Sequence, residues 1–279
     1  MLTRYALERL LYRLSQSEHR DVFVLKGAML FQLWSDQPHR PTRDLDLLGR
    51  GDSSTSRFEA ILREVCEIAV EDDGLTFCTE SMHGDVIKED QEYEGLRLTL
   101  EGRLEDARIP IQIDIGFGDV VTPAASEVRY PVLLDFPAPI LAAYSRESVV
   151  AEKFQAMVML GMVNSRMKDF YDLWILAGQF TFQGPLLCEA IRATFERRRT
   201  LVPSNVPTAL SAGFSQDGNK QAQWRAFANK SKLDIGGIGL DEVAVVLRDF
   251  LLPCGCAVAA GTVLDMKWPP SGPWQVASE

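Results

Sequence analysis

The stretch RPTRDLDLLGR, residues 40–50, places two aspartates one residue apart at the start of an apolar run. This alternation predicts a β-strand over residues 44–49 that stops at the glycines beyond it. Because side chains in a strand alternate between faces, Asp44 and Asp46 share one face while the intervening leucines point to the core. Two adjacent carboxylates repel, and a cation between them relieves the repulsion. Taken alone, the pair is better explained as two exposed aspartates.

A second segment supplies a third carboxylate of the same kind. In IPIQIDIG, residues 109–116, the isoleucines share one face and leave Gln112 and Asp114 on the other. We expect Asp114 rather than Asp119 to complete the site, because Asp119 follows two glycines and is expected in a loop. Three carboxylates on adjacent strands suit Mg²⁺. The order of elements is typical of nucleotidyl transfer from an NTP with two metals, one activating the attacking hydroxyl and one neutralising the pyrophosphate that leaves.

A glycine turn precedes the acid pair. The apolar segment DVFVLKG, residues 21–27, predicts a short strand that ends at Lys26 and Gly27, and residues 28–35 have the composition of a helix. Gly27 permits close approach of a phosphate, and the N-terminus of a helix offers N–H groups to an anion. One glycine after a strand is weak evidence by itself.

The second half of the chain carries a lysine in apolar surroundings. Lys153 has apolar neighbours at helical spacing, so its ammonium either extends to solvent or is aimed at a fixed anion, with about even odds. In RMKDFYDLW, Asp169 and Asp172 lie three residues apart on one side of an expected helix. This acidic side is either hydrated or orients Lys153, Lys168 or a nucleotide in a cleft between the two halves of the chain.

The hydrophobic periodicity predicts an α+β protein of two parts. We expect helices at residues 1–20 and 53–70, a β-meander from 75 to 115, and a last strand within residues 129–139. After about residue 140 the pattern is helical, and the tail from residue 261 is expected to lack regular structure. The predicted domains are a mixed-sheet α/β domain at residues 1–140 and a helical domain at 141–279 that completes the nucleotide and acceptor cleft.

Composition excludes several classes of protein. Apolar residues make up 46% and charged residues 24% of the chain, and no segment is apolar for long enough to cross a bilayer. The N-terminal residues mix charge with leucine, unlike a signal peptide, which favours a cytoplasmic protein. The five cysteines and three histidines form no zinc pattern. A net charge of −10 argues against coating nucleic acid by bulk electrostatics but allows a local basic groove.

Together these motifs resemble the AbiEii family of nucleotidyltransferase toxins, which includes the MenT-type toxins. The resemblance rests on five segments in this order: LKGAMLFQLW, RPTRDLDLLG, IQIDIGFGD, ESVVAEKFQAMVMLG and NSRMKDFYDLW. It covers roughly residues 20–180, and as a set the segments are highly specific. The family is similar to other members of the polymerase β-like nucleotidyltransferase superfamily, and it supplies the toxic half of toxin–antitoxin or phage-defence pairs.

The resemblance implies a role for particular residues. Asp44 and Asp46 would be metal ligands with Asp114 as the third carboxylate, and Lys153 and Asp172 would complete the catalytic set. The implied nucleotide-binding residues are Lys26, Gly27, Thr42, Arg43, Lys153, Lys168 and Asp169. The family usually has a small polar residue or a second glycine where this chain has Ala28, and Thr42 is the candidate that could replace its hydroxyl.

The resemblance also implies an activity. Members of the family transfer nucleotides, in some cases pyrimidines to the acceptor end of tRNA, which blocks aminoacylation. A tRNA acceptor would need a local positive surface, for which the candidates are Arg40, Arg43, Lys153, Arg166, Lys168 and residues 197–199. The expected partners are therefore an NTP, tRNA and an antitoxin, with no membrane. Two alternatives stay open: a protein or small-molecule hydroxyl as the acceptor, and a non-catalytic member that binds a nucleotide or a partner.

Overall fold

The computed structural model describes residues 1–35, 40–88 and 94–276 and divides the chain into two compact units. Unit 1 comprises Met1–Asp119 and Ala125–Tyr144, and unit 2 comprises Val120–Ala124 and Ser145–Glu279. A mixed sheet followed by helices confirms the predicted α+β class. The roles predicted for residues 1–140 and 141–279 stay predictions.

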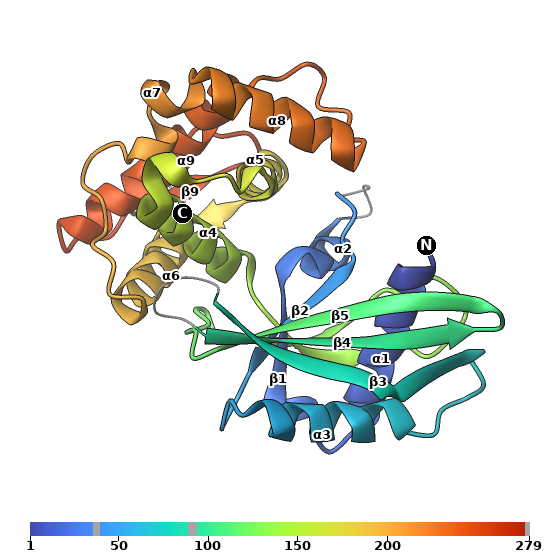
Figure 1. Ribbon diagram of the computed structural model, residues 1–279. Helices are drawn as coiled ribbons and strands as arrows, with labels where there is room; N and C mark the ends of the chain where they lie inside the picture. The colour runs from blue at the N-terminus through green and yellow to red at the C-terminus, as the bar shows by residue number, and fades with distance from the viewer. Residues whose placement is uncertain (36–39, 89–93, 277–279) are drawn as a thin grey trace. The chain divides into compact units, whose positions relative to one another are not determined.

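Unit 1 is built on a seven-stranded sheet with the order β3-β4-β5-β2-β1-β7-β6 in the part of the chain described (Figure 1). The strands are β1 (Phe23–Lys26), β2 (Asp44–Gly49), β3 (Leu75–Lys88), β4 (Glu94–Leu104), β5 (Ala107–Phe117), β6 (Ser126–Arg129) and β7 (Ile140–Ala143). The predicted strand at residues 44–49 and the predicted meander are confirmed. β3, β4 and β5 pair antiparallel, whereas β2 lies parallel to β5 and antiparallel to β1.

Two helices, α1 (Leu2–Gln16) and α3 (Thr55–Glu67), cover one face of this sheet (Figure 1). The strand residues that face them are apolar: Leu45, Leu47 and Ile113 are at most 1% exposed. Burying such side chains contributes roughly 2 kcal/mol each to folding. The opposite face carries the polar residues of the same strands, including the predicted carboxylates.

A group of buried charges joins α1 to the loop before β3. The Asp73 carboxylate accepts hydrogen bonds from Arg9 Nε at 2.8 Å and from the two Nη atoms of Arg13 at 2.7 and 3.0 Å. The Asp73 and Arg9 side chains are 1% and 0% exposed. We call Arg9, Arg13 and Asp73 the sealed cluster.

Two expectations for unit 1 were wrong. Residues 28–35 do not form a long helix: a 3-10 turn (Gly27–Leu30) leads into the single-turn α2 (Phe31–Trp34). Residues 130–139 are irregular between β6 and β7 rather than a strand. Three prolines in that segment remove N–H donors that a strand would need, so β6 ends before the segment and β7 begins after it.

Unit 2 is mainly helical (Figure 1). Its helices are α4 (Arg146–Leu160), α5 (Met167–Gln179), α6 (Gly184–Arg197), α7 (Ala212–Ser215), α8 (Gly218–Ser231) and α9 (Leu240–Ala259). The Ser145 side chain caps α4 by accepting a hydrogen bond from the Ser148 N–H. None of the helices in the described ranges is both long and apolar enough to cross a membrane.

The irregular tail predicted from residue 261 was also wrong. β9 (Met266–Trp268) pairs with β8 (Phe182–Gln183) and β10 (Gln275–Val276). Trp268 is 2% exposed, and its indole N–H donates to the Ala177 carbonyl at 2.8 Å. The tail is held because its tryptophans bury large apolar area on unit 2.

Candidate active site

A row of charged residues crosses the open face of the sheet in unit 1. Across neighbouring strands, Lys26 on β1 pairs with Asp46 on β2, Asp46 with Asp114 on β5, and Asp114 with Arg97 on β4. Residues paired in register lie on the same face of a sheet, with strands about 4.8 Å apart. Two carboxylates are therefore bracketed by two cations. We call Lys26, Asp46, Asp114 and Arg97 the sheet-face row.

A second polar row lies next to it. Asp44 on β2 pairs with Gln112 on β5, and Gln112 pairs with Thr99 on β4. Asp44 and Asp46 are both half-buried, whereas Leu45 between them is buried on the other face. The structure thus brings together, on one face of adjacent strands, the three carboxylates that the sequence singled out.

Arg97 is a site residue that the sequence reasoning missed. Its guanidinium makes two parallel hydrogen bonds to Asp114, Nε to Oδ1 at 2.8 Å and Nη2 to Oδ2 at 2.7 Å. Hydrogen bonding to Asp114 raises the pKa of Arg97, and the charges of Asp44 and Asp46 add to this shift. Arg97 is thus held in the combined field of all three carboxylates.

Asp119 is the second residue that was missed. It lies just beyond β5, as expected of a loop, but its side chain is only 6% exposed and accepts a hydrogen bond from Lys26 Nζ at 3.2 Å. Lys26 is itself 8% exposed. The predicted nucleotide-loop lysine is thus fixed at the edge of the carboxylate face by a fourth acid.

The structure gives a reason for glycine at position 27 that the sequence did not suggest. Its φ is +75°, and a Cβ added to it would collide with the carboxylate of Asp46. Glycine is therefore needed here both for the backbone conformation and for the close approach of the Asp46 side chain. A role for Gly27 in binding phosphate stays a prediction.

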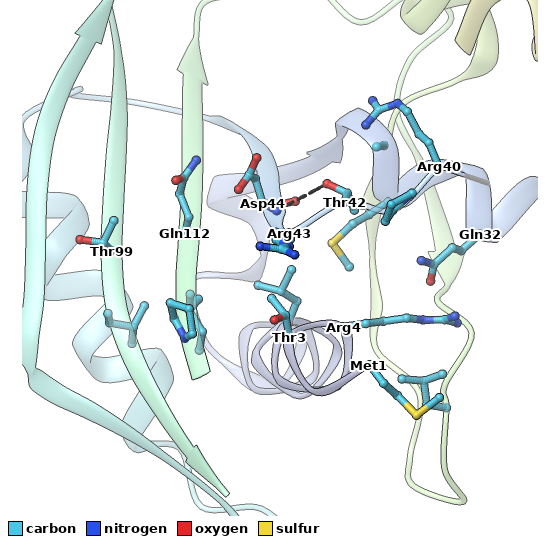
Figure 2. A pocket seen from close by; sticks show the side chains of 18 of the residues that line it. Met1, Thr3, Arg4, Gln32, Arg40, Thr42, Arg43, Asp44, Thr99 and Gln112 are labelled. Carbon is cyan, nitrogen blue, oxygen red and sulfur yellow. Dashed lines mark hydrogen bonds between the residues drawn. The ribbon is translucent and has the colours of Figure 1, made fainter. Parts of the chain in front are cut away.

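Thr42 and Arg43 lead into β2. The Thr42 hydroxyl donates to the backbone carbonyl of Asp44 at 3.2 Å, so it stabilises the entry of the strand (Figure 2). Arg43 is exposed and lines the same pocket as Asp44 and Gln112 (Figure 2). Their predicted contacts with a nucleotide stay predictions.

Unit 2 contains the other predicted cluster. Lys153 Nζ on α4 lies 2.5 Å from Asp169 Oδ1 and 2.9 Å from Asp172 Oδ2, both on α5. Asp172 is fully buried and Asp169 is 6% exposed, so the acidic side of α5 faces the lysine rather than water. Lys168, in contrast, is exposed. Of the two alternatives for Lys153, the structure favours the lysine aimed at fixed anions.

The carboxylates on the sheet differ from a tight metal-ligand group. In residues 1–35, 40–88 and 94–276, the one set of three acidic or histidine ligand atoms mutually within 4.8 Å belongs to Glu18, His19 and Glu64. That set is superficial, and His19 already pairs with Glu64, whose side chain is 61% exposed. The predicted ligands are spaced more widely, since Asp44 and Asp46 stand about 6.6 Å apart along β2 and Asp114 is drawn to Arg97.

The donor set nevertheless fits a hard divalent cation. Three carboxylates lie on one face of adjacent strands, and carboxylate oxygens are the ligands that Mg²⁺ prefers in proteins. A row in which two acids stand side by side gains from any added positive charge. The assignment of Asp44, Asp46 and Asp114 as ligands stays a prediction that this chemistry supports.

Comparisons with known proteins give a family and a fold. A family model described as "Nucleotidyl transferase AbiEii toxin, Type IV TA system" matches residues 9–239. No curated protein matches the sequence.

Among solved structures, the crystal structure of JHP933 from Helicobacter pylori has a TM-score of 0.50 and 15% identity, over 93% of this chain and 92% of that one. At this identity the likeness concerns the fold. A second H. pylori protein, described with nucleotidyltransferase as its suggested activity, has a TM-score of 0.47 and 15% identity, over 93% and 95% of the chains.

Proposed function

Because the chain belongs to the AbiEii family of nucleotidyltransferase toxins, we propose that it transfers nucleotides from an NTP to the 3′ end of a tRNA, with Mg²⁺, and so blocks translation. The observation that carries this proposal is the pair of register matches that sets Asp46 beside Asp114, with Asp44 on the same face. Adjacent like charges destabilise a sheet, and a bound cation would relieve their repulsion in addition to Lys26 and Arg97 on either side.

The carboxylates would hold the metal. Mg²⁺ bound by Asp44, Asp46 and Asp114 would supply the positive charge that makes the acceptor hydroxyl a nucleophile and that neutralises the departing pyrophosphate. Gly27 makes room for the Asp46 carboxylate, whereas Arg97 holds both oxygens of Asp114 and would compete with the metal for them. The chain's own contribution is therefore a preorganised set of oxygen donors.

The cations would hold the triphosphate. Lys26 is held by Asp119 at the edge of the carboxylate face, and Arg43 is exposed next to Asp44. In unit 2, Asp169 and Asp172 orient the ammonium of Lys153, which we propose as a further phosphate contact. Lys168 and Thr42 are assigned lesser roles in binding the nucleotide. Lys168 is exposed, and the Thr42 hydroxyl already donates a hydrogen bond to the backbone carbonyl of Asp44.

The biological setting follows from the family. A toxin of this kind is paired with an antitoxin, and the resemblance to MenT-type toxins implies the acceptor end of tRNA as the target. An acceptor of that kind places the proposed activity in the cytoplasm.

The test is transfer of label. The protein is incubated with Mg²⁺, total tRNA and each of the four NTPs, labelled in turn at the α- and the γ-phosphate. We expect labelled RNA from one or more α-labelled nucleotides and none from γ-labelled ones, and loss of label with Asp46→Asn. The absence of labelled RNA with all four nucleotides would contradict the proposal, and label in protein bands alone would support transfer to a protein hydroxyl.

A further inference from the structure

Unit 1 contains a large groove that meets the candidate site at Asp44. Its volume is about 1330 Å³, which exceeds the roughly 300–1,000 Å³ of an ordinary small-molecule pocket. Thr42, Arg43, Asp44 and Gln112 line it at the carboxylate end, and Arg4 at the start of α1 lines it farther along (Figure 2). A ligand that fills it is larger than one ordinary small molecule and reaches Asp44.

The groove follows from strand lengths. β2 begins at Asp44, which pairs with Gln112, whereas β5 begins five residues earlier at Ala107. Residues 107–111 therefore pair with β4 on one side, and on the other side the sheet has a notch. The N-terminal turn of α1 lies at this notch, because Arg4 and Leu7 line the groove together with Ile111 of β5.

The charge of the groove is opposite to that of the protein. The chain carries a net charge of −10, yet the groove is lined by four arginines and two acids. The arginines are Arg4, Arg40, Arg43 and Arg108, and the acids are Asp44 and Glu101. Asp44 belongs to the proposed metal site, and Glu101 lies 4.0 Å from Arg108. Away from the carboxylates, the groove offers a positive surface.

Its other polar groups are neutral hydrogen-bonding side chains. Thr99, Gln112 and Gln32 line the groove, and it contains no aromatic residue among those described. Arg4 points from α1 toward Gln32 (Figure 2), and its Nε is buried without a hydrogen-bond partner in the described part of the chain.

We propose that this groove binds the single-stranded 3′-terminal segment of the acceptor RNA through its phosphates, and so delivers the terminal hydroxyl to Asp44. The inference rests on the proposed function and adds the path of the acceptor. Arginines recognise phosphate oxygens by paired hydrogen bonds, whereas base stacking would require aromatic side chains. The groove therefore suits recognition of the backbone more than of the base sequence.

A peptide is the competing occupant, because residues 107–111 present a strand edge. That edge is short and contains Pro110, which has no N–H to donate to an added strand. Four arginines also exceed what pairing with a neutral strand would need. The RNA backbone is the better match.

The experiment measures binding without catalysis. A fluorescent single-stranded oligoribonucleotide of about eight nucleotides with a free 3′-hydroxyl is titrated with protein by anisotropy, without NTP or divalent metal, at several salt concentrations. The test variant is Arg4→Ala with Arg108→Ala, since neither residue is in the proposed catalytic set. The matched control is Arg129→Ala, an exposed arginine of β6 outside the groove. A variant with lysine at both positions keeps the charge if alanine disturbs folding, which circular dichroism checks.

We expect the double alanine variant to bind at least about tenfold more weakly and to lose about 1.4 from the slope of log K against log salt, for two phosphate contacts with a single strand. The lysine variant should keep the slope, and Arg129→Ala should match the wild type. Equal binding by the double alanine variant and the control would overturn the proposal, as would no binding by the wild type. Displacement of the RNA by an equal concentration of an acidic octapeptide would also overturn it. Binding is scored without nucleotide transfer, so a failure here is distinct from a failure of the proposed function.

Discussion

Two groups of charged side chains in unit 1 use hydrogen-bonded ion pairs of the same length in opposite surroundings. In the sealed cluster, Asp73 accepts from Arg9 and Arg13 at 2.7–3.0 Å, and its side chain is 1% exposed. In the sheet-face row, Asp114 accepts from Arg97 at 2.7 and 2.8 Å, but the Arg97 side chain is 40% exposed. The sealed cluster is closed to ligands, whereas in the sheet-face row another cation can replace Arg97 beside Asp114.

This difference shows that burial decides whether an ion pair stabilises the fold or remains available to bind a ligand. Burial alone would raise the pKa of Asp73, but hydrogen bonds from Arg13 and Arg9 outweigh it and lower that pKa. The cost of separating such a pair is high, so it locks α1 in place. At the sheet face, water and ligands can replace either partner, so the same chemistry is available for binding.

The largest expected effect is on stability in the sealed cluster. Asp73→Asn leaves two guanidinium groups buried without their counter-ion and should lower the free energy of unfolding by about 3–5 kcal/mol at pH 7. Because the pKa of Asp73 is lowered in the fold, its contribution is present above about pH 4 and is lost as the pH falls through the folded pKa. Urea melts at pH 7 and pH 3 should show the gap between variant and wild type narrowing. A gap that widens in acid would contradict this account.

Asp46→Asn should give the converse result. We expect nucleotide transfer to fall by more than about a hundredfold, since even indirect partners of metal ligands are worth 10- to 100-fold. The free energy of unfolding should change by less than about 1 kcal/mol, because Asp46 is half-buried in an open face. Asp85→Asn is the matched control: Asp85 pairs with Arg97 in register on β3, and its side chain is 62% exposed. Equal losses of transfer in the two variants would argue against a special role for Asp46.

Gly27→Ala should affect both properties to a smaller extent. A positive φ costs a residue with a Cβ about 1–2 kcal/mol, and the added atom must also push the Asp46 carboxylate aside. We expect lower stability together with lower transfer. Gly236 has a similar φ of +60°, but a Cβ added there would meet no atom within 4 Å. Gly236→Ala should therefore lower stability without lowering transfer. Transfer rates of the two folded variants separate backbone strain from displacement of the Asp46 carboxylate. Unchanged transfer in Gly27→Ala would show that the added methyl group does not displace that carboxylate.

Arg97→Gln should have the smallest effect, and in the direction of gain. Removing a cation a few ångströms from the carboxylates should tighten Mn²⁺ binding by about three- to tenfold, by Coulomb's law at an effective dielectric constant between protein and water. Arg103→Gln on the same strand, whose arginine pairs with Glu101, should leave the affinity unchanged. Calorimetric titration measures both, and weaker binding in Arg97→Gln would mean that Arg97 assists the metal rather than competes with it.

The faces of the strands were predictable from sequence because side-chain alternation has a period of two. That period placed Asp44 and Asp46 opposite Leu45, and it placed Asp114 opposite the isoleucines, as the structure has them. The cap at Ser145 was predictable for a similar local reason. These features depend on residues near each other in the chain.

The partners across strands were not predictable in the same way. Arg97 stands in the alternating segment EGLRLTLEGRL, which indicates its face but not that it pairs with Asp114, because the register of β4 against β5 depends on the turn between them. Asp119 looked like a loop residue because nothing local shows that Lys26 lies beside it. The β-pairing of the tail likewise depends on a strand more than eighty residues earlier in the chain.

The most direct test of the contrast between sealed and open charges is a Mn²⁺ titration of the nucleotide-free protein, followed by electron paramagnetic resonance. Glu64→Gln serves as the background, so that the superficial group of Glu18, His19 and Glu64 does not contribute. We predict that this protein and its Asp85→Asn derivative bind Mn²⁺ with equal affinity, and that Asp46→Asn binds at least about tenfold more weakly. Equal affinity in all three proteins would contradict the claim that the sheet-face carboxylates hold the metal.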